Sequence, residues 1–288
     1  MVVGLAAGGL WAETLTIATY NVENYVAEDR MVEGTYRPDY PKPEATKQAL
    51  RTAIRALDAD LLVLQEMGPP PYLEELRRDL RTEGMVYAHA ALAEAADSVR
   101  HVAVLSRRPF KRTTTHAHLE FRYFGALEKV KRGLLEIALD VPGGELTVFA
   151  LHLKSRFTDR PDDPLSALRR AGEAEVIRNF ILRRFPDPTA ARFLIIGDCN
   201  DTKDSKPLRL LTARGKTVIA ELIEAADSRG EIWTHFYRKG DSYARVDHFL
   251  VSPGLRPAVA GGGARIGDGP GVREASDHRP VMLRLEFR

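Results

Sequence analysis

Polar residues that could bind a metal ion or transfer a proton recur in this chain where short apolar runs stop. Strand ends on one side of a sheet bring such residues together in space even when they are far apart in the sequence. Carboxylates and amides are ligands for hard metal ions, and carboxylates and imidazoles move protons. The pattern therefore predicts one cleft. Its members are Asn21 after residues 15–19, Glu66 after residues 61–64, His152 and Lys154 at the end of the run from residue 146, and Asp198 and Asn200 after residues 193–197.

Taken singly, each of these residues has an ordinary structural explanation. A carboxylate such as Glu66 or Asp198 after a strand is most often a loop or cap residue, and an Asn there is usually a turn residue. Residues 276–280 (Ser-Asp-His-Arg-Pro) could equally form a plain loop before the final strand. The conjunction of these residues along one chain is what indicates function. Histidines outside the pattern are interpreted as structural or surface residues: His89, His116, His118 and His235.

Hydrophobic patterning predicts the elements that must position these side chains. Amphipathic periodicity predicts long helices over residues 44–57 and 165–185, and shorter ones over 72–82 and 207–214. Gly143 and Gly144, between two apolar runs, predict a tight hairpin turn. Many strands with a few helices and a plain hairpin indicate a layered α/β or α+β fold with mixed sheets. The expected strands are residues 15–20, 61–65, 101–106, 134–141, 146–152, 193–197, 246–251 and 281–287.

Composition narrows the class of protein. The 288 residues are 44% hydrophobic and 28% charged, which is typical of an ordinary globular protein and excludes disordered and collagen-like chains. The 42 basic and 40 acidic residues give a net charge of +2, so any attraction for phosphate must be local. Cys199 is the single cysteine, which excludes an internal disulfide and a multi-cysteine zinc site. A bound metal would need oxygen ligands.

The first twelve residues are small and apolar, and they resemble the back half of a secretory signal that ends near Ala12. They lack a positively charged start, so a leading strand or a wrongly assigned start codon is the alternative. We expect a secreted or periplasmic protein, with the cytoplasm as the other location. Residues 13–288 contain no linker and are expected to form a single domain, active as a monomer without a protein partner and without stable membrane insertion.

Seven motifs along the chain, taken together, resemble one known family. They are TYNVEN from Thr19, DADLLVLQE ending at Glu66, HVAVLSRRP from His101, FALHLKSR from Phe149, IIGDCND from Ile195, RVDHFLVS from Arg245 and SDHRPV from Ser276. In this order they resemble the endonuclease/exonuclease/phosphatase superfamily, which includes pancreatic-type deoxyribonuclease, exonuclease III-like repair nucleases, sphingomyelinases and inositol polyphosphate 5-phosphatases. The resemblance implies a four-layered α/β (α+β) sandwich, with two mixed sheets packed face to face and helices outside.

The resemblance also implies a metal site. Glu66 matches the glutamate that ligates Mg²⁺, with Asp277 assisting, and Asn21 matches the asparagine that contacts the metal shell or the scissile phosphate. Mg²⁺ is usually held by one or two carboxylates together with water and substrate phosphate, so this small ligand set is chemically sufficient. Mn²⁺ could replace it on the same ligands.

Catalytic roles are implied for five further residues. Asp198 and Asn200 match a pair in which the aspartate orients or deprotonates water and the asparagine binds a phosphate oxygen. Their i, i+2 spacing places both side chains on one face if strand geometry persists. Asp247 and His278 match a pair in which the carboxylate orients an imidazole toward the phosphate. His152 matches a second active-site histidine whose carboxylate partner the sequence does not reveal.

A phosphate-binding role is implied for Arg132. Together with the metal and catalytic residues above, the resemblance implies metal-assisted, in-line attack of water on a phosphoester, without a covalent enzyme intermediate. A non-catalytic module with this fold is the contrasting hypothesis, but it would be expected to have lost one or more site residues.

The substrate is expected to be DNA or RNA. Basic runs at residues 107–112 and 129–132 could follow a nucleic-acid backbone, and Phe121, Tyr123 and Phe124 could stack on bases. Arg169, Arg170, Arg183 and Arg184 are expected on the solvated face of a helix. The alternative is a small-molecule or lipid phosphoester, as in sphingomyelinases; the sequence shows no long apolar hairpin for a bilayer, which argues against a lipid.

Overall fold

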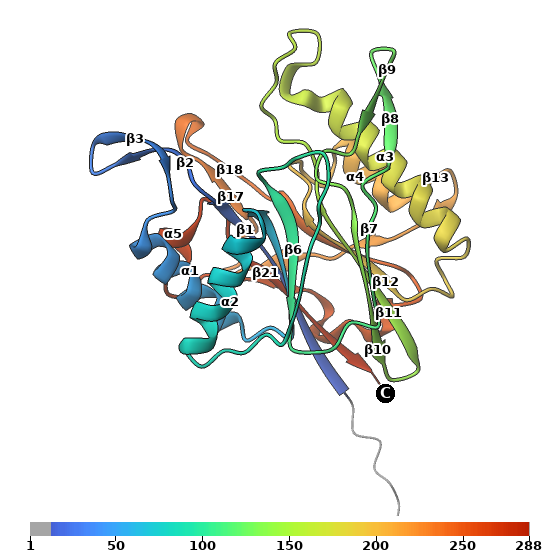
Figure 1. Cartoon of the computed structure of the whole chain (residues 1–288). Helices are drawn as coiled ribbons and strands as arrows, with labels where there is room; N and C mark the ends of the chain where they lie inside the picture. The colour runs from blue at the N-terminus through green and yellow to red at the C-terminus, as the bar shows by residue number, and fades with distance from the viewer. Residues whose placement is uncertain (1–12, 288) are drawn as a thin grey trace, which may run out of the picture.

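The computed structural model describes residues 13–287, and its core is two mixed β-sheets packed face to face (Figure 1). The seven-stranded sheet has the order β16 (Ala225–Ala226), β20 (Ala264–Ile266), β21 (Val281–Phe287), β1 (Glu13–Tyr25), β4 (Leu61–Met67), β6 (His101–Ser106) and β5 (His89–Leu92). The six-stranded sheet has the order β15 (Glu221–Leu222), β19 (Asp247–Val251), β12 (Phe193–Asp198), β11 (Gly144–His152), β10 (Leu135–Val141) and β7 (Arg112–Thr115).

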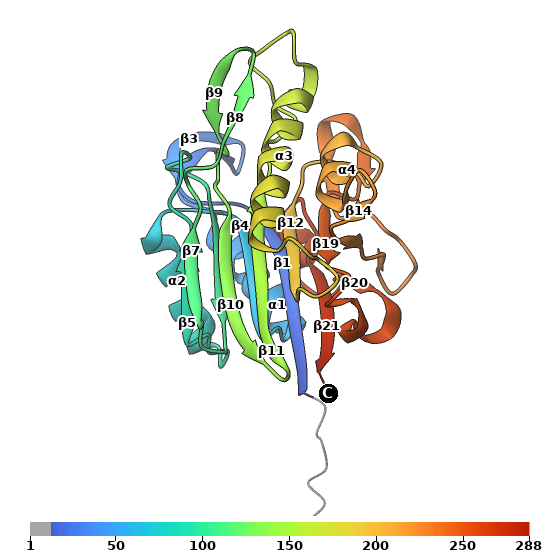
Figure 2. The ribbon, with the colours of Figure 1, turned by 90° about the vertical axis from the view of Figure 1, so that its right-hand side faces the viewer.

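Side chains alternate between the two faces of each sheet, and this alternation separates the core into layers. Ile17 of β1 and Ile196 of β12 belong to one buried cluster, which lies between the sheets. Ala18 and Ile195 point the other way, into clusters shared with helices. The fold is therefore the expected four-layered sandwich. The outer helices are α1 (Glu44–Leu57), α2 (Pro70–Thr82) and α5 (Val272–Ala275) on the larger sheet, and α3 (Ala167–Arg184) and α4 (Lys206–Thr212) on the smaller (Figure 2).

The strands and helices expected from the sequence are all present, some with the expected bounds, such as residues 44–57 and 281–287, and others with shifted ends. The helix expected over residues 165–185 begins at Ala167, because a 3₁₀ turn (Pro164–Ser166) precedes it. The helix expected over residues 207–214 spans Lys206–Thr212, and Ser205 caps its start by accepting a hydrogen bond from the Leu208 N–H. The remaining 3₁₀ turns are Arg238–Gly240, Arg256–Ala258 and Ala260–Gly262.

Short hairpins that the sequence did not predict extend from one end of the sandwich. Three of them project at the end opposite the paired residues Glu13 and Phe287 (Figures 1 and 2). Their strands are too short and too polar for periodicity to reveal. The hairpins are β2 (Glu28–Val32) with β3 (Thr35–Tyr40), β8 (Glu120–Tyr123) with β9 (Ala126–Lys129), and β17 (His235–Tyr237) with β18 (Ser242–Ala244); a further pair is β13 (Ala213–Arg214) with β14 (Thr217–Val218).

Within residues 13–287, no helix combines the length and apolarity needed to cross a membrane. The expected export segment, residues 1–12, lies outside the described residues.

Candidate active site

The candidate site caps the apolar layer between the two sheets. On β12, Leu194 and Ile196 face that layer, so the same alternation turns Asp198 inward. Side chains two residues apart in a strand lie on the same face, so Asn21, His152 and Asp247 also point inward, near the ends of β1, β11 and β19. Each of these four polar residues is only 1% exposed. The inner faces of both sheets therefore change from apolar to polar at the end where the hairpins project.

Strand register brings three of these residues into one row. His152 pairs with Asp198 between β11 and β12, and Asp198 pairs with Asp247 between β12 and β19. Gly197 permits the close approach, because a Cβ at this position would lie 2.0 Å from the Leu151 carbonyl oxygen. The glycine also has φ 139°, which side-chain-bearing residues rarely adopt.

Asp198 is held by amide donors from both sheets. Asn21 Nδ2 donates to Asp198 Oδ2 over 3.0 Å, and the Asn200 backbone N–H donates to Asp198 Oδ1 over 2.7 Å. The strand geometry expected to align Asp198 and Asn200 does not persist, because β12 ends at Asp198 and Asn200 has φ 52°. A tight turn joins the two side chains instead, with Asn200 Nδ2 3.4 Å from Asp198 Oδ2.

The two site histidines have opposite electrostatic environments. Burial alone would lower the pKa of His278, but Asp247 Oδ2, 2.9 Å from its Nδ1, together with Asp198 raises that pKa well above its usual value. Burial, Arg132 and His278 lower the pKa of His152 well below its usual value. His278 is thus an imidazolium at neutral pH, whereas His152 is a neutral imidazole.

Neighbouring amides fix the tautomer of His152. Asn200 Nδ2 lies 3.1 Å from His152 Nε2 and donates to the Leu153 carbonyl over 3.0 Å. An amide nitrogen only donates, so Nε2 accepts and the ring proton is on Nδ1. Among the described residues, Nδ1 is buried and has no hydrogen-bond partner. Because Nε2 carries no proton, it cannot donate to Asp198 Oδ2, which lies 3.5 Å away, and among the described residues the structure gives His152 no carboxylate hydrogen-bond partner.

Asp198 has the protonation behaviour of a general base. Burial and the adjacent Asp247 raise the pKa of Asp198 to about 7. His278 opposes this rise, because its Nε2 is 3.9 Å from Asp198 Oδ2. A carboxylate with a pKa near the working pH can both accept and release a proton.

Hydrogen bonds tie Glu66, Glu23 and the backbone of Asp277 to the end of β1, where the candidate metal site is expected. The Asn24 N–H donates to Glu66 Oε2 over 3.0 Å, and the Asp277 N–H donates to Glu23 Oε2 over 3.2 Å. Burial and Asp277 raise the pKa of Glu23, as expected where carboxylates repel one another. Lys42 Nζ, 3.9 Å from Glu23 Oε2, offsets part of this charge. Such a set of oxygen donors with excess negative charge fits Mg²⁺ or Mn²⁺.

A β-bulge orients Glu66 toward this site. Regular alternation would turn Glu66 to the outer face with Leu62 and Leu64, but Glu66 has φ 61° and the pairing with β6 shifts register between Leu64 and Met67. Such strained backbone is common at functional sites. Glu23, which has φ 47° in the segment Asn21-Val22-Glu23-Asn24, was not identified as a site residue; its only signal was its position two residues after Asn21.

In the described part of the chain, two clusters place His and carboxylate ligand atoms within 4.8 Å of one another. One consists of Asp198, Asp247 and His278, and the other of His235, Asp277 and His278. Glu66 belongs to neither. The structure therefore links Glu66 to Asp277 only indirectly, through the consecutive residues Asn24 and Glu23.

Arg132 is buried on the His152 side of the site. Its Nε lies 3.1 Å from Asp97 Oδ2, and its Nη1 has no hydrogen-bond partner among the described residues. Its charge contributes to the lowered pKa of His152. The guanidinium is thus held near the site by Asp97 and is largely shielded from solvent.

Helix α3 contributes two buried charges that sequence reasoning missed. Arg170 was expected on the solvated face, but it is 2% exposed and its Nε donates to Asp201 Oδ2 over 3.0 Å. Glu173, 1% exposed, accepts hydrogen bonds from the backbone N–H groups of Lys131 and Lys154. These contacts tie the segments after His152 and Asn200 to one helix. Arg183 and Arg184 are exposed, as expected.

The basic run at residues 107–112 lies at the wrong end of the sandwich for the site. Ser106, just before this run, pairs with Leu61 at the start of β4, whereas Glu66 is near the other end of that strand. The basic side chains of residues 107–112 also form ion pairs with carboxylates. Arg107 pairs with Asp58, Arg108 with Glu13, Lys111 with Asp140, and Arg112 with Glu136 and Glu145. Two of the expected stacking rings are buried, Phe121 at 8% and Tyr123 at 5% exposed, while Phe124 is 50% exposed.

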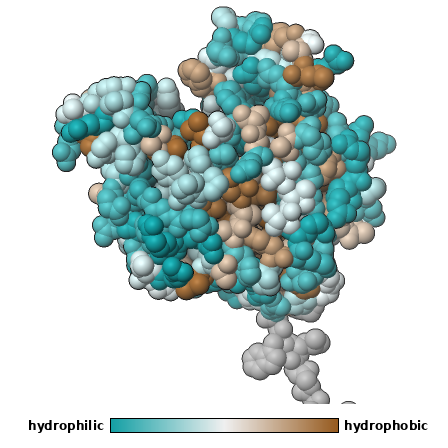
Figure 3. Space-filling model, in the orientation of Figure 1, coloured by the Kyte–Doolittle hydropathy of each residue, from teal (hydrophilic) through white to brown (hydrophobic). Residues whose placement is uncertain are grey.

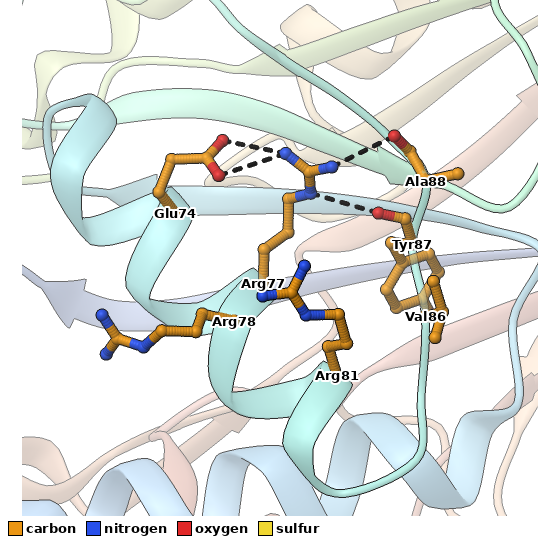
Figure 4. Close-up of a pocket in the computed structure, with 7 residues that line it drawn as sticks. All are labelled: Glu74, Arg77, Arg78, Arg81, Val86, Tyr87 and Ala88. Carbon is orange, nitrogen blue, oxygen red and sulfur yellow. Dashed lines mark hydrogen bonds and ion pairs between the residues drawn. The ribbon is translucent and has the colours of Figure 1, made fainter.

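A basic pocket of about 220 Å³ lies apart from the site, between α2 and the segment of residues 86–88 (Figure 4). Arg77 is fixed there by Glu74 and by the carbonyl oxygens of Tyr87 and Ala88. These contacts attach the segment after α2 to the helix. The pocket contains none of the candidate catalytic residues.

Comparison with known families shows which class of protein has this fold. Residues 18–278 match the model of the endonuclease/exonuclease/phosphatase family, so the chain belongs to that family. Members of this family are hydrolases that act on phosphoester bonds. No curated protein matches the chain.

Solved structures with diverse substrates share the fold. Sphingomyelinase C from Streptomyces griseocarneus is 18% identical, with a TM-score of 0.63, covering 95% of this chain and 99% of that one. The human Nocturnin catalytic domain is 14% identical, with a TM-score of 0.66, covering 96% and 98% of the two chains. A 3′-5′ exonuclease from Neisseria meningitidis is 16% identical, with a TM-score of 0.60, covering 95% and 100%.

Proposed function

We propose that this protein is a divalent-metal-dependent phosphodiesterase that cleaves DNA or RNA by in-line attack of water. The observation that carries the proposal is the buried row of Asp198 and Asp247 with the imidazolium of His278. It places a carboxylate whose pKa is about 7 within 3.9 Å of a cationic proton donor. A base and a cation at this separation can act on the attacking water and on the phosphoryl group of one substrate.

The side chains divide the chemistry between them. Asp198 accepts the proton of the attacking water. Asn21 and Asn200 fix the orientation of the Asp198 carboxylate through their hydrogen bonds to it. His278, oriented by Asp247, directs its Nε2 proton at a phosphoryl oxygen and stabilises the developing charge. Mg²⁺ held by Glu66 with Asp277 would act as a Lewis acid on the phosphoryl group.

Nucleic acid as the substrate is supported by exposed cations at the site end. Arg156 donates from Nε to the Asn200 carbonyl over 3.3 Å, its Nη2 lies 3.6 Å from Asp201 Oδ1, and its side chain is 45% exposed. Lys129, the last residue of β9, and Lys131, two residues later, are exposed, and the exposed Phe124 ring lies at the tip of the β8–β9 hairpin. These residues replace the run at 107–112 as the candidate contacts with a polyanionic backbone.

A lipid phosphoester is the second candidate, because large apolar side chains are also exposed at this end. The sequence suggested no apolar hairpin, but the β8–β9 hairpin exposes the side chains of Phe124 and Leu127. Three more large apolar side chains are exposed in residues 157–168. Figure 3 shows brown patches over the region of β8, β9 and α3. Exposed apolar side chains of this kind favour a membrane surface or another apolar partner. The exposed fractions are Phe124 50%, Leu127 63%, Phe157 78%, Leu165 58% and Leu168 51%.

Sizing the products of a substrate panel tests both candidates. The panel consists of supercoiled plasmid, linear duplex, RNA, bis-p-nitrophenyl phosphate and sphingomyelin vesicles, each with Mg²⁺ and with chelator. Metal-dependent cleavage of nucleic acid supports the proposal. Cleavage of sphingomyelin alone, lost in a Phe124→Ser/Leu127→Ser variant that still cleaves the soluble diester, would replace it with the lipid candidate.

A further inference from the structure

His235 lies against two residues of the candidate site from a different strand. Its Nε2 is 3.5 Å from Asp277 Oδ2, and Asp277 Oδ1 is 4.0 Å from His278 Nε2. The two imidazole rings are 4.5 Å apart between centroids, at an interplanar angle of 34°. One ligand atom from each of the three residues lies within 4.8 Å of the others.

The backbone holds these three side chains in a preformed arrangement. His235 and His278 form an antiparallel bridge. The Phe236 N–H donates to the Asp277 carbonyl over 3.0 Å, and the Arg279 N–H donates to the Thr234 carbonyl over 2.6 Å. The cluster therefore requires only small side-chain movements to close around an ion.

The donor set differs in kind from that of the candidate Mg²⁺ site. His278 Nδ1 donates its hydrogen bond to Asp247, so only Nε2 can become a ligand atom, and a metal ion must displace its proton to bind there. Two imidazole nitrogens and one carboxylate suit Zn²⁺, whereas Mg²⁺ prefers oxygen donors throughout. The side chains of His235 and Asp277 are 24% and 31% exposed, so an ion can enter and keep a water as its fourth ligand.

We propose that His235, Asp277 and His278 form a second, inhibitory metal site that takes Zn²⁺ or a similar borderline transition metal. Zn²⁺ bound at His278 Nε2 would displace the Nε2 proton to solvent, which removes the proton donor that faces Asp198, and would occupy Asp277. The protein would then be active with Mg²⁺ and inhibited by trace Zn²⁺. The inhibition rests on the proposed function, but the binding of Zn²⁺ does not.

The contrasting explanation is that His235 only orients Asp277 through a hydrogen bond, without any metal. The two explanations differ in what a metal-binding measurement reports. A purely orienting histidine leaves Zn²⁺ affinity unchanged when it is replaced, whereas loss of one of three ligands lowers that affinity by at least about tenfold.

Calorimetric titration of the whole protein with Zn²⁺ in excess Mg²⁺ tests the site directly. We expect one Zn²⁺ per chain, an affinity at least about tenfold lower in His235→Ala and His235→Gln, and no change in the matched control His118→Ala, which replaces an exposed histidine. Thermal unfolding of each variant without Zn²⁺ verifies its fold. Equal Zn²⁺ binding by wild type and by a folded His235 variant would overturn the proposal.

The inhibition is measured in parallel, on the hydrolysis of bis-p-nitrophenyl phosphate at saturating Mg²⁺. Each variant is compared with its own rate without Zn²⁺, and the Zn²⁺ concentration for half inhibition should rise at least about tenfold when His235 is replaced. Zn²⁺ binding that depends on His235 but leaves hydrolysis uninhibited would overturn the inhibitory role. A protein that binds Zn²⁺ through His235 and hydrolyses no phosphoester would instead contradict the proposed function alone.

Discussion

Asn21 of one sheet donates a hydrogen bond to Asp198 of the other, with 3.0 Å between Nδ2 and Oδ2, although the two residues are 177 positions apart in the chain. The bond crosses the layer between the sheets at the point where that layer changes from apolar to polar. It stabilises the charged form of a buried carboxylate whose pKa burial raises. The relative placement of the two sheets is therefore coupled to the proposed base.

Replacing Asn21 with Ala should reduce kcat/KM by about 10²-fold and the free energy of unfolding by about 1–3 kcal/mol, because the Asp198 carboxylate loses a buried donor. Kinetics and urea unfolding measure the two effects. Because both residues act through one bond, Asn21→Ala should cost much less activity in an Asp198→Asn background. Full additivity of the two effects would show that the bond is not used in catalysis.

His278→Gln should lower the rate by at least about 10²-fold, since a neutral amide replaces the cation at the phosphoryl group. Gln can still donate to Asp247, so the thermal midpoint should change less than in His278→Ala, which leaves the Asp247 carboxylate buried and unpaired. Single-turnover kinetics and thermal unfolding of both variants provide the comparison. A rate for His278→Gln close to wild type would remove His278 from the reaction.

Glu66→Ala should raise the Mg²⁺ concentration for half-maximal activity by at least about tenfold, because the bulge presents this carboxylate to the candidate metal site. Activity against Mg²⁺ concentration measures it, and Glu33→Ala, at an exposed turn position, is the matched control. An unaltered metal requirement and unaltered kinetics at saturating Mg²⁺ would exclude Glu66 as a ligand.

Neutralising Arg107, Arg108, Lys111 and Arg112 together should leave the salt dependence of DNA binding unchanged, because these residues lie away from the site and are paired with carboxylates. Neutralising Lys129, Lys131 and Arg156 should flatten it, with the slope decreasing by about 0.9 for each DNA phosphate that the protein no longer neutralises. Binding isotherms at several salt concentrations measure both slopes. The reverse result would restore the 107–112 run as the binding track.

The buried His248 should make the protein less stable in acid. Burial lowers the pKa of His248 to about 4, and its Nε2 lies 2.9 Å from the Asp201 carbonyl oxygen. Between about pH 6.5 and pH 4, His248 is protonated in the unfolded chain but stays neutral in the folded protein. The free energy of unfolding therefore decreases as the pH falls through this window, by up to about 3 kcal/mol. Urea unfolding against pH measures the slope, which His248→Gln should reduce and His118→Gln should not. Equal slopes in wild type and His248→Gln would contradict the lowered pKa.

Much of the fold could be predicted from sequence because its main elements are locally encoded. Apolar runs such as residues 61–65 and 193–197 are long enough to identify buried strands, and the motifs at their ends identified Asp198, Asp247 and His278 as belonging together. The short hairpins were missed, since Phe121 and Tyr123 of β8 are buried by packing against α3 rather than by any local pattern.

The set of chemically capable residues, their order and the layered family fold could be inferred from the sequence, because they depend on residue type, spacing and alternation. Which charged residues lie at the site became evident only from the packing of distant segments. Arg170 is buried against Asp201, and His235 lies against Asp277. Residues 107–112 lie at the end of the sandwich opposite the site. Strand register and helix packing fix those relationships across long stretches of chain, and no local pattern encodes them.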